Sequence, residues 1–197
     1  MCGRYFIDDE TSKEIDKILK KLEEREQASL IKKTGDIRPT DYALGWISKK
    51  NHMEPTALKW GFANPNGKNL IINARVETAA SKRLFREAMQ NRRCIIPASG
   101  FYEWNANKEK FSFSSKDASM LYFAGIFDFI SSVPSFVILT TQANQSVADI
   151  HERMPLLLKK EQLEPWLFDF EKAEKISLQV PEPLRCIGEN VQMTLDL

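Results

Sequence analysis

The spacing of hydrophobic residues predicts an amphipathic helix near the start of the chain, over residues 11–27 (TSKEIDKILKKLEEREQ). Its apolar residues follow the i, i+3, i+4, i+7 spacing that places side chains on one helix face: Ile15, Ile18, Leu19 and Leu22. Thr11 or Ser12 is expected to cap the first turn. The opposite face carries charges of alternating sign, so we expect a peripheral helix that packs on a sheet.

Three further segments are predicted to be helical. The clearest covers residues 82–90, with Ser81 as its cap and four apolar side chains turned inward: Leu84, Phe85, Ala88 and Met89. Short helices are expected near residues 143–150 and 160–168.

Most other apolar segments are short and rich in β-branched or aromatic residues, which is typical of strands. They are residues 57–62, 69–72, 93–96, 100–104, 111–114, 121–127 and 135–140, and polar, Gly or Pro residues separate them. Weaker strands are expected near 176–180 and 184–187, whereas 28–56 and 105–110 are predicted to be loops or turns.

Strands and helices do not alternate regularly along the chain, which argues against a doubly wound parallel sheet. The pattern instead predicts an α+β fold with a mainly antiparallel, strongly curved sheet and peripheral helices. A chain of 197 residues without internal repeats is expected to form a single domain over residues 1–197.

Composition narrows the class of protein and its compartment. Hydrophobic residues make up 43% and charged residues 28% of the chain, which is ordinary for a soluble globular protein. No apolar run is long enough to span a membrane, so no membrane partner is expected. Charged residues within the first ten positions are unlike a secretory signal, and a cytoplasmic, intracellular protein is therefore expected.

Cysteine and histidine usage limits the metal chemistry. Three cysteines without a CxxC spacing predict neither disulfides nor structural zinc, and two histidines exclude a histidine-rich metal site. Cys94 and Cys186 lie in apolar, strand-like runs and are expected to be inert core residues. His52 lies among charged and polar loop residues and is expected to be exposed.

The net charge of +1 favours no particular partner, but the charge is unevenly distributed. Residues 75–93 contain six basic side chains against only Glu77 and Glu87. Such a stretch is most often a solvated helix face, although it also suits nucleic acid. Three of its arginines are predicted to be solvated or to add general positive charge: Arg86, Arg92 and Arg93.

Four polar residues occupy positions where a structural role is not the only interpretation: Cys2, Asn73, Glu103 and His151. Each has a structural alternative. Cys2 can be a small packed residue, and Asn73 can close a turn at the end of a strand. Glu103 can face solvent on an edge strand, and His151 can form a capping hydrogen bond.

Together, these four residues suggest a nucleophile with an acid–base pair. Cysteine peptidases use Cys, His and Asn, where imidazole takes the thiol proton and an amide orients the ring. Because Cys2 is small, removal of Met1 by an aminopeptidase is expected, which leaves an amine and a thiol on one residue. An α-amino group has a pKa of roughly 7.7–8.0, so it attacks aldehydes near neutral pH, and the thiol then closes a thiazolidine ring.

Five sequence motifs, in order and spacing, resemble those of the SOS response-associated peptidase (SRAP) family. They are MCGR at 1–4, WG at 60–61, NARVET at 73–78, RRCIIPASGFYEW at 92–104 and DIHERMP at 149–155. The resemblance implies a single α+β domain with a curved, barrel-like β core and a positively charged DNA groove. It also implies a sensor of abasic sites in single-stranded DNA that forms a covalent thiazolidine with the ring-opened deoxyribose. We expect no cofactor or metal, and a monomer.

The resemblance implies a role for each of the four candidates. Cys2 supplies both the amine and the thiol, and Glu103 shuttles protons while the imine forms and the ring closes. His151 assists opening of the sugar ring, and Asn73 orients Cys2 and the opened sugar. Hydrolytic or lyase-like reversal of the crosslink, assisted by Glu103, is a further activity that the resemblance permits.

The same resemblance implies the DNA contacts. Phosphate groups are expected at four arginines: Arg4, Arg75, Arg83 and Arg153. Trp60 and Pro39 are expected to offer apolar surface to bases beside the lesion, although Trp60 can equally be a core residue. Thr140 is expected to hydrogen-bond the DNA backbone.

Two alternative functions remain open. One is a thiol peptidase that uses Cys2 and His151, with removal of its own leader as the simplest form. The other is a binding module for single-stranded or modified DNA. Binding by such a module is independent of Cys2 and weakens steeply with salt.

Overall fold

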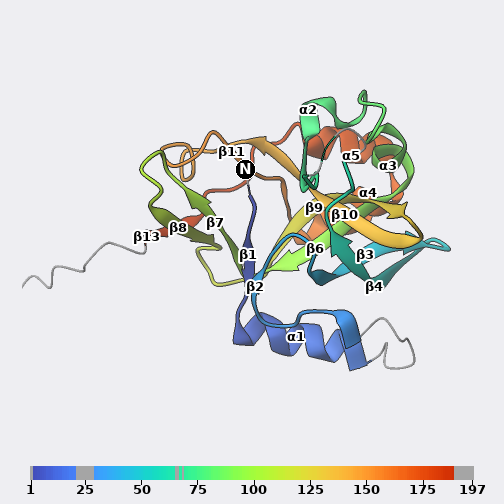
Figure 1. Ribbon diagram of the computed structural model, residues 1–197, viewed down its shortest axis with the longest axis horizontal. Coiled ribbons are helices and arrows are strands. Elements are labelled where there is room, and N and C mark those ends of the chain that lie inside the picture. The colour runs from blue at the N-terminus through green and yellow to red at the C-terminus, as the bar shows by residue number, and fades with distance from the viewer. Residues whose placement is uncertain (1, 21–28, 65–66, 68, 189–197) are drawn as a thin grey trace, which may run out of the picture.

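The computed structural model describes residues 2–20, 29–64, 67 and 69–188. Figure 1 shows two β-sheets at the centre, with helix α1 (Asp9–Lys20) on one side and the other helices grouped at the opposite end. These are α2 (Val76–Ala79), α3 (Arg86–Asn91), the 3-10 helix η2 (Lys160–Gln162), α4 (Leu163–Phe168) and α5 (Phe170–Ser177). Within the described ranges, no helix has both the length and the apolar character needed to cross a membrane.

The larger sheet closes into a barrel. Its strands are β3 (Tyr42–Lys49), β4 (His52–Trp60), β5 (Asn73–Arg75), β6 (Arg93–Ala98), β9 (Leu121–Ile130), β10 (Val133–Gln142), β11 (Arg153–Pro155) and β12 (Leu157–Leu158). The order β10-β4-β3-β6-β9 forms a ring, because β9 pairs with β6 and also returns to β10. Only the pairings of β10 with β4 and β5 are parallel among the described strands. The predicted α+β fold with a curved, mainly antiparallel, barrel-like core is therefore confirmed.

The smaller sheet positions the start of the chain. Its order is β13 (Arg185–Gly188), β8 (Lys110–Ser114), β7 (Gly100–Trp104), β1 (Tyr5–Ile7) and β2 (Gly35–Ile37), with antiparallel pairing throughout. Strand β1 lies between β7 and β2, so the N-terminal segment lies inside the fold (Figure 1). Hydrogen bonds on both sides tie this segment down, whereas most chain termini are frayed.

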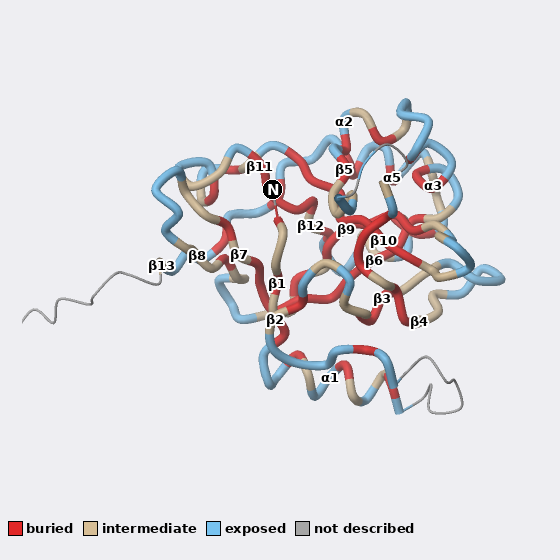
Figure 2. Tube along the Cα trace, in the orientation of Figure 1, coloured by how far each residue is buried: buried red, intermediate tan, exposed pale blue. Residues whose placement is uncertain are grey.

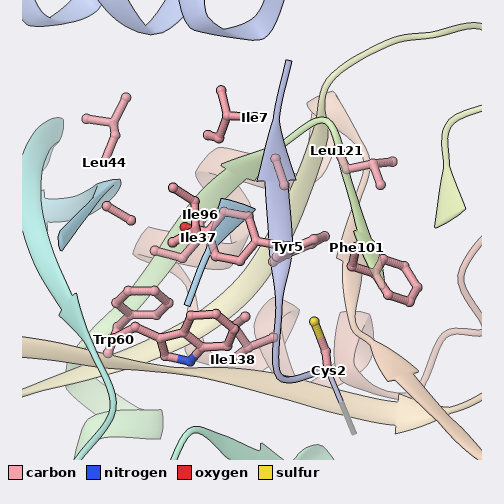
Figure 3. Packing of buried hydrophobic residues seen from close by; sticks show 14 of the residues in the cluster. Cys2, Tyr5, Ile7, Ile37, Leu44, Trp60, Ile96, Phe101, Leu121 and Ile138 are labelled. Atoms are coloured by element: carbon pink, nitrogen blue, oxygen red, sulfur yellow. The ribbon is translucent and has the colours of Figure 1, made fainter. Parts of the chain in front are cut away.

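The barrel wall is buried on both faces. Inward side chains of its strands, such as Trp60, Ile96 and Ile138, belong to a first core cluster (Figure 3). Alternate side chains, such as Ile95 and Leu139, belong to a second cluster with residues of α2–α5. Because successive side chains of a strand point to opposite faces, burial of both faces explains the continuous apolar runs in the sequence. Figure 2 shows this buried interior in red beneath exposed loops.

The first predicted helix is confirmed in α1, with a different cap. Ile15 and Leu19 are buried in the first core cluster, as their spacing indicated. The Oδ1 atom of Asp8 accepts the backbone N–H of Thr11 at 2.8 Å, so Asp8 caps the helix. The expected cap at Thr11 or Ser12 is therefore wrong, since the helix begins at Asp9. Residues 21–27 of the prediction lie outside the described part of the chain.

The other helix predictions have mixed outcomes. Helix α3 begins at Arg86 rather than at residue 82, and Leu84 is 38% exposed instead of inward. The Ser81 hydroxyl donates to the carbonyl of Thr78, so it does not cap α3. Residues 160–168 are helical in η2 and α4, as predicted. Residues 145–150 form turns rather than a regular helix, because Asn144 Oδ1 accepts the Ser146 N–H.

The strand predictions succeed where apolar residues are continuous. Strands are confirmed at 93–96, 100–104, 111–114, 121–127, 135–140 and 184–187, and most of 57–62 lies in β4. The segment 28–56, predicted as loop, instead contains β2, β3 and the start of β4. Polar residues at the exposed end of the β3–β4 hairpin, such as Lys49 and His52, hide its strand pattern. Residues 69–72 form only an isolated bridge. The predicted strand at 176–180 is also wrong, because residues 176 and 177 end helix α5 and 178–180 follow it.

Candidate active site

Strand pairing brings Cys2 close to Glu103. Tyr5 is opposite Phe101 in the β1–β7 register, and the Tyr102 N–H donates to the carbonyl of Arg4 at 3.0 Å. Continuing this antiparallel register places Gly3 opposite Glu103, with Cys2 one residue beyond. Figure 3 shows the Cys2 side chain near Tyr5 and Phe101, at the edge of the first core cluster.

Asn73 connects this segment to the barrel. It begins strand β5, which runs beside β10 with Asn73 opposite Ile138. Its Nδ2 atom donates to the carbonyl oxygen of Cys2 at 2.8 Å. Its Oδ1 atom is also buried and finds no hydrogen-bond donor among the described residues. The amide thus fixes the backbone of Cys2 and directs an acceptor into the same region.

His151 lies where the turns after β10 lead into β11. Its backbone N–H donates to the carbonyl of Val147 at 3.0 Å. The backbone N–H of Arg153 donates to the ring Nδ1 of His151 at 2.9 Å. The same Nδ1 atom lies 3.2 Å from the carbonyl oxygen of Arg153. The imidazole ring is therefore held in position by its own local backbone.

The Cys2 thiol is held in its protonated form. The side chain has no exposed surface, and its Sγ atom lies 3.7 Å from the carbonyl oxygen of Arg4. Burial raises the pKa of the Cys2 thiol well above its usual range, and the negative charge of Glu103 adds to the increase. A resting thiolate is therefore disfavoured, and the sulfur needs a proton acceptor before it can react.

Glu103 is placed to hold and release protons. It is 3% exposed, on the face of β7 that points into the fold. Burial raises the pKa of the Glu103 carboxyl, and the positive charge of His151 opposes this increase. Glu103 is thus close enough to Cys2, and His151 close enough to Glu103, for their charges to interact. A buried carboxyl with a raised pKa suits general acid–base work near neutral pH.

The four candidate residues therefore converge from separate parts of the sequence. Cys2 precedes β1, Asn73 starts β5, Glu103 lies on β7, and His151 precedes β11. Among the described residues, no group of three or more His, Cys, Asp or Glu side chains is arranged to hold a metal ion. This region of the fold thus contains a thiol, a carboxyl, an imidazole and an amide. Their chemical roles stay predictions.

Two of the four arginines expected to bind phosphate are exposed. Arg75 has a side chain that is 56% exposed, and its nearest carboxylate, on Glu152, is 3.9 Å away. Arg83 is exposed in the segment before α3. Arg4 is half-buried, with its guanidinium 5.3 Å from the ring centre of Trp104 and 3.5 Å from Asp36. Pro39 is half-buried in the turn that follows β2.

Arg153 and Thr140 are engaged in internal contacts, which contradicts the predicted DNA contacts. Arg153 donates to both carboxylate oxygens of Glu77, at 2.7 and 2.8 Å, and to the carbonyl of Thr140 at 2.6 Å. Its side chain is only 8% exposed. Thr140 has no exposed surface, and its hydroxyl lies 3.5 Å from the carbonyl of Ala74. Both residues hold β10, β11 and α2 together instead of facing a ligand.

Trp60 is a core residue, which corrects the prediction that it stacks on bases. It has no exposed surface, and its Nε1–H donates to the carbonyl of Ile72 at 2.9 Å. Its ring lies 5.3 Å from the ring of Tyr5 and 6.0 Å from that of Phe136. The alternative of a core tryptophan is therefore confirmed, since the ring fills the barrel next to β1.

Of four further predictions of burial, two are confirmed and two are wrong. Arg93 is buried and donates to backbone carbonyls of Met89 and Trp166, so it is neither solvated nor available to a ligand. Cys94 is buried and His52 is exposed, as predicted. Cys186 is exposed on β13, so the prediction of a core position is wrong. Strand β13 is the edge of its sheet, and its outer side has no covering layer among the described residues.

The sequence analysis missed the surroundings of Arg4. Asp36 on β2 lies 3.5 Å from Arg4 and 3.6 Å from Arg38. The ring of Trp104 packs against the guanidinium of Arg4. The outward orientation of Trp104 was predictable from the sequence, because neighbouring side chains of a strand point to opposite faces and Glu103 points inward. No comparable signal existed for Asp36, whose segment was predicted to be a loop.

Curated relatives share most of the length of the chain. The abasic site processing protein YoaM of Bacillus subtilis is 30% identical over 186 residues, which cover 85% of this chain and 79% of the relative. The abasic site processing protein YedK of Escherichia coli is 32% identical over 178 residues, with the same coverage of 85% and 79%. The activity in both names is that of the two relatives.

The fold also matches solved structures. A crystal structure of a protein from Bacteroides thetaiotaomicron superposes with a TM-score of 0.75 at 24% identity, covering 95% of this chain and 91% of that one. The sequence model of the family described as SOS response associated peptidase (SRAP) matches residues 1–192. A single domain over residues 1–197 stays a prediction. The converging cysteine, carboxyl, histidine and amide are thus features of a chain that belongs to the SRAP family.

Proposed function

We propose that this protein processes abasic sites in single-stranded DNA by forming a thiazolidine crosslink between Cys2 and the lesion. The observation that carries the proposal is the convergence of Cys2, Asn73, Glu103 and His151 around one buried thiol. The family assignment and the names of the curated relatives support the same substrate.

The reaction begins once Met1 is removed and the α-amine of Cys2 is free. The amine attacks the C1′ aldehyde of the ring-opened deoxyribose and gives a carbinolamine, which loses water to form an imine. The Cys2 sulfur then adds to the imine carbon and closes the five-membered ring. The amine nitrogen keeps one of its own protons throughout, and one water is the only product lost.

Glu103 moves the protons in this sequence. In its protonated form it donates to the leaving hydroxyl of the carbinolamine, which departs as water. The resulting carboxylate then accepts the proton of the Cys2 thiol, whose pKa is raised by burial. The iminium nitrogen keeps its own proton, so the thiol proton restores the protonated form of Glu103 when the ring closes. A carboxyl whose own pKa is raised can serve in both steps.

His151 and Asn73 prepare the reactants. His151 donates a proton that assists cleavage of the sugar C1′–O4′ bond and releases the aldehyde. Asn73 holds the Cys2 carbonyl, and its buried Oδ1 is an acceptor for the freed α-amine or for a hydroxyl of the opened sugar. These contacts fix the orientation of the attacking group before the lesion arrives.

The exposed arginines supply the contacts to DNA. Arg75 and Arg83 are available to phosphates, and Arg4 lies next to the site with Trp104 against it. Phosphate contacts carry no base information, which suits recognition of a lesion in any sequence. We propose that the protein acts as a monomer on a single strand, where an abasic residue is not covered by a partner strand.

Burial of the thiol disfavours a general thiol peptidase. Such enzymes depend on a thiolate with a lowered pKa, whereas the pKa of Cys2 is raised. The fully buried side chain also leaves little room for a polypeptide substrate. A non-covalent binding module remains the alternative outcome of the following test.

Intact-mass spectrometry tests the proposal directly. The purified protein is measured before and after mixing with a single-stranded oligonucleotide that carries one abasic site. We expect loss of Met1, then an adduct that survives denaturation and whose mass equals the sum of both partners minus one water. Cys2→Ala should form no such adduct.

Cys186→Ala is the matched control, because Cys186 is an exposed thiol without an α-amine. It should crosslink like the unaltered protein. A processed protein that binds the oligonucleotide without forming an adduct would establish the binding-module alternative. An adduct that depends on Cys186 instead of Cys2 would overturn the proposed chemistry.

A further inference from the structure

The outer face of the smaller sheet carries a row of aromatic side chains. Along β7, Phe101 and Glu103 point into the fold, so Tyr102 and Trp104 point to the opposite face. The ring of Tyr102 lies 6.5 Å from that of Trp104 and 5.1 Å from that of Phe6 on β1. All three side chains are half-buried, so each retains exposed surface. We name these three residues the aromatic row.

One end of the aromatic row is adjacent in the chain to the candidate site, on the opposite face of β7. Trp104 follows Glu103 in the chain, and Arg4, whose guanidinium covers Trp104, is two residues from Cys2. Phe6 lies at the other end of the row, beyond Tyr102. The row therefore leads away from the site across the outer surface of strands β7 and β1.

Cations flank the aromatic row. Lys110, opposite Trp104 in the β7–β8 register, places its Nζ atom 3.8 Å from the ring centre of Tyr102. Arg4 lies over Trp104 at 5.3 Å and is also paired with Asp36. Proteins that bind single-stranded nucleic acids combine aromatic rings with nearby cations. The bases stack on the rings, and the phosphates pair with the cations.

We propose that the aromatic row binds the stretch of single-stranded DNA that leaves the active site on one side of the lesion. Bases of the strand stack on Tyr102 and Phe6. Phosphates pair with Lys110 and with Arg4, where a phosphate replaces Asp36 as the partner of the guanidinium. The inference rests on the proposed function for its direction, because the strand enters at the lesion beside Glu103. Stacking of this kind tolerates any base, as a lesion sensor requires.

Length-dependent binding of undamaged oligonucleotides tests this inference without any covalent chemistry. Affinities are measured for single strands of about 4 and about 16 nucleotides, which bracket the usual length range of such binding sites. The long strand reaches the aromatic row, whereas the short one occupies the active-site region alone. Tyr102→Ala is expected to reduce the ratio of long-strand to short-strand affinity roughly tenfold, because a stacked base is lost.

Two variants serve as controls for Tyr102→Ala. Tyr102→Phe keeps the ring and should keep the ratio. Phe129→Ala removes another surface ring, 61% exposed on β9, and should leave the ratio unchanged. An unchanged ratio in folded Tyr102→Ala, or an equal loss in Phe129→Ala, would overturn the inference.

Charge reversal gives a second route if Tyr102→Ala fails to fold. Lys110→Glu should lower the same affinity ratio several-fold, most strongly at low salt. Lys175→Glu on α5, at the other end of the molecule, is the matched control for net charge (Figure 1). Equal effects of the two reversals would show that only net charge matters, which contradicts a specific path for the strand.

A fluorescent base analogue then fixes the direction of the strand. 2-Aminopurine, which is quenched by stacking, is placed at increasing distances on either side of the abasic site in the crosslinked complex. Quenching is expected on one side only and should disappear in Tyr102→Ala. If no crosslink forms but the length effect persists, the proposed function fails and this inference stands. If a crosslink forms but affinity does not depend on strand length through Tyr102, the proposed function stands and this inference fails.

Discussion

At the scale of single residues, Glu103 combines two opposing demands. A buried carboxylate costs stability, yet the proposed proton transfers require this group in a dry site. Glu103→Gln keeps the shape of the side chain and removes its charge. We therefore predict that the variant slows crosslink formation while it stabilises the fold at neutral pH.

The pH dependence of this stabilisation has a definite sign. The folded-state pKa of Glu103 is raised above the value of about 4.3 expected in the unfolded chain, so the folded state loses stability as pH rises through that interval. Glu103→Gln lacks this loss. Its melting temperature should exceed that of the unaltered protein at pH 7 and match it near pH 4. Thermal melts across pH check this, and an advantage that grows on acidification would contradict it.

Arg153 and Arg75 differ in role although the sequence suggested the same one. Arg153→Ala breaks the ion pair between the buried Arg153 guanidinium and the partly exposed Glu77 carboxylate, and it leaves the Thr140 carbonyl without this donor. We predict a loss of about 2 kcal/mol, which lowers the melting temperature by about 4–8 °C in a protein of this size. Arg75→Ala should change stability by less than about 0.5 kcal/mol but weaken DNA binding. Melting curves and binding measurements on both variants separate the two roles, and an unchanged melting temperature in Arg153→Ala would contradict the structural role.

At the scale of elements, the pairing of β1 with β7 determines whether a site exists. Gly100 faces Phe6 across this pair, and an added Cβ atom would lie 2.5 Å from the Phe6 ring and also meet the backbone oxygen of Phe113. Gly100→Ala must therefore shift β7, which carries Glu103, against Phe113 of β8 and the Phe6 ring of β1. We predict a stability loss of about 1–3 kcal/mol and a larger loss of crosslinking rate than of DNA affinity.

Gly35→Ala is a useful comparison for Gly100→Ala. No atom lies within 4 Å of a Cβ at Gly35, but its φ of +76° disfavours alanine. This variant should lose about 1 kcal/mol without displacing β1 from β7. Crosslinking rates measured at a temperature where both variants are folded test the distinction. Equal rates in the two variants would show that the β1–β7 spacing does not control the site.

Elements were predictable where burial was uniform. Strands of the barrel are buried on both faces, so their apolar runs stand out in the sequence, as in β6 and β10. The β3–β4 hairpin was missed because its far end is exposed and polar. Residues 176–180 suggested a strand, yet Ala173 and Ile176 pack against the barrel wall as part of α5. Tertiary packing overrides weak local preference in both cases.

At the scale of the whole molecule, we predict that binding to DNA depends on a few accessible cations and not on net charge. Three of the four predicted phosphate ligands remain accessible: Arg4, Arg75 and Arg83. For a single strand, each phosphate contact contributes about 0.7 to the slope of log affinity against log salt. We predict a slope of about −2 for the non-covalent complex of Cys2→Ala, with further contributions from the aromatic row on long strands.

Removal of single arginines tests this count. Arg75→Ala should reduce the slope by about 0.7, whereas Arg153→Ala, compared at a temperature where it is folded, should leave the slope as it is. Salt titrations of a short oligonucleotide give both numbers. A slope that falls equally in the two variants would mean that Arg153 leaves Glu77 to bind phosphate.

The sequence by itself determined the fold class, the amphipathic face of α1, most barrel strands and the identity of the four candidate groups. These properties follow from local periodicity and from the chemistry of individual side chains, which a linear sequence contains. Only the tertiary structure decided which polar residues are exposed. In the folded protein, Arg153, Thr140 and Trp60 are buried and Cys186 is exposed. Pairing of β1 with β7 brings the residues of the aromatic row together. Exposure depends on contacts between segments far apart in the chain, and no local pattern encodes those contacts.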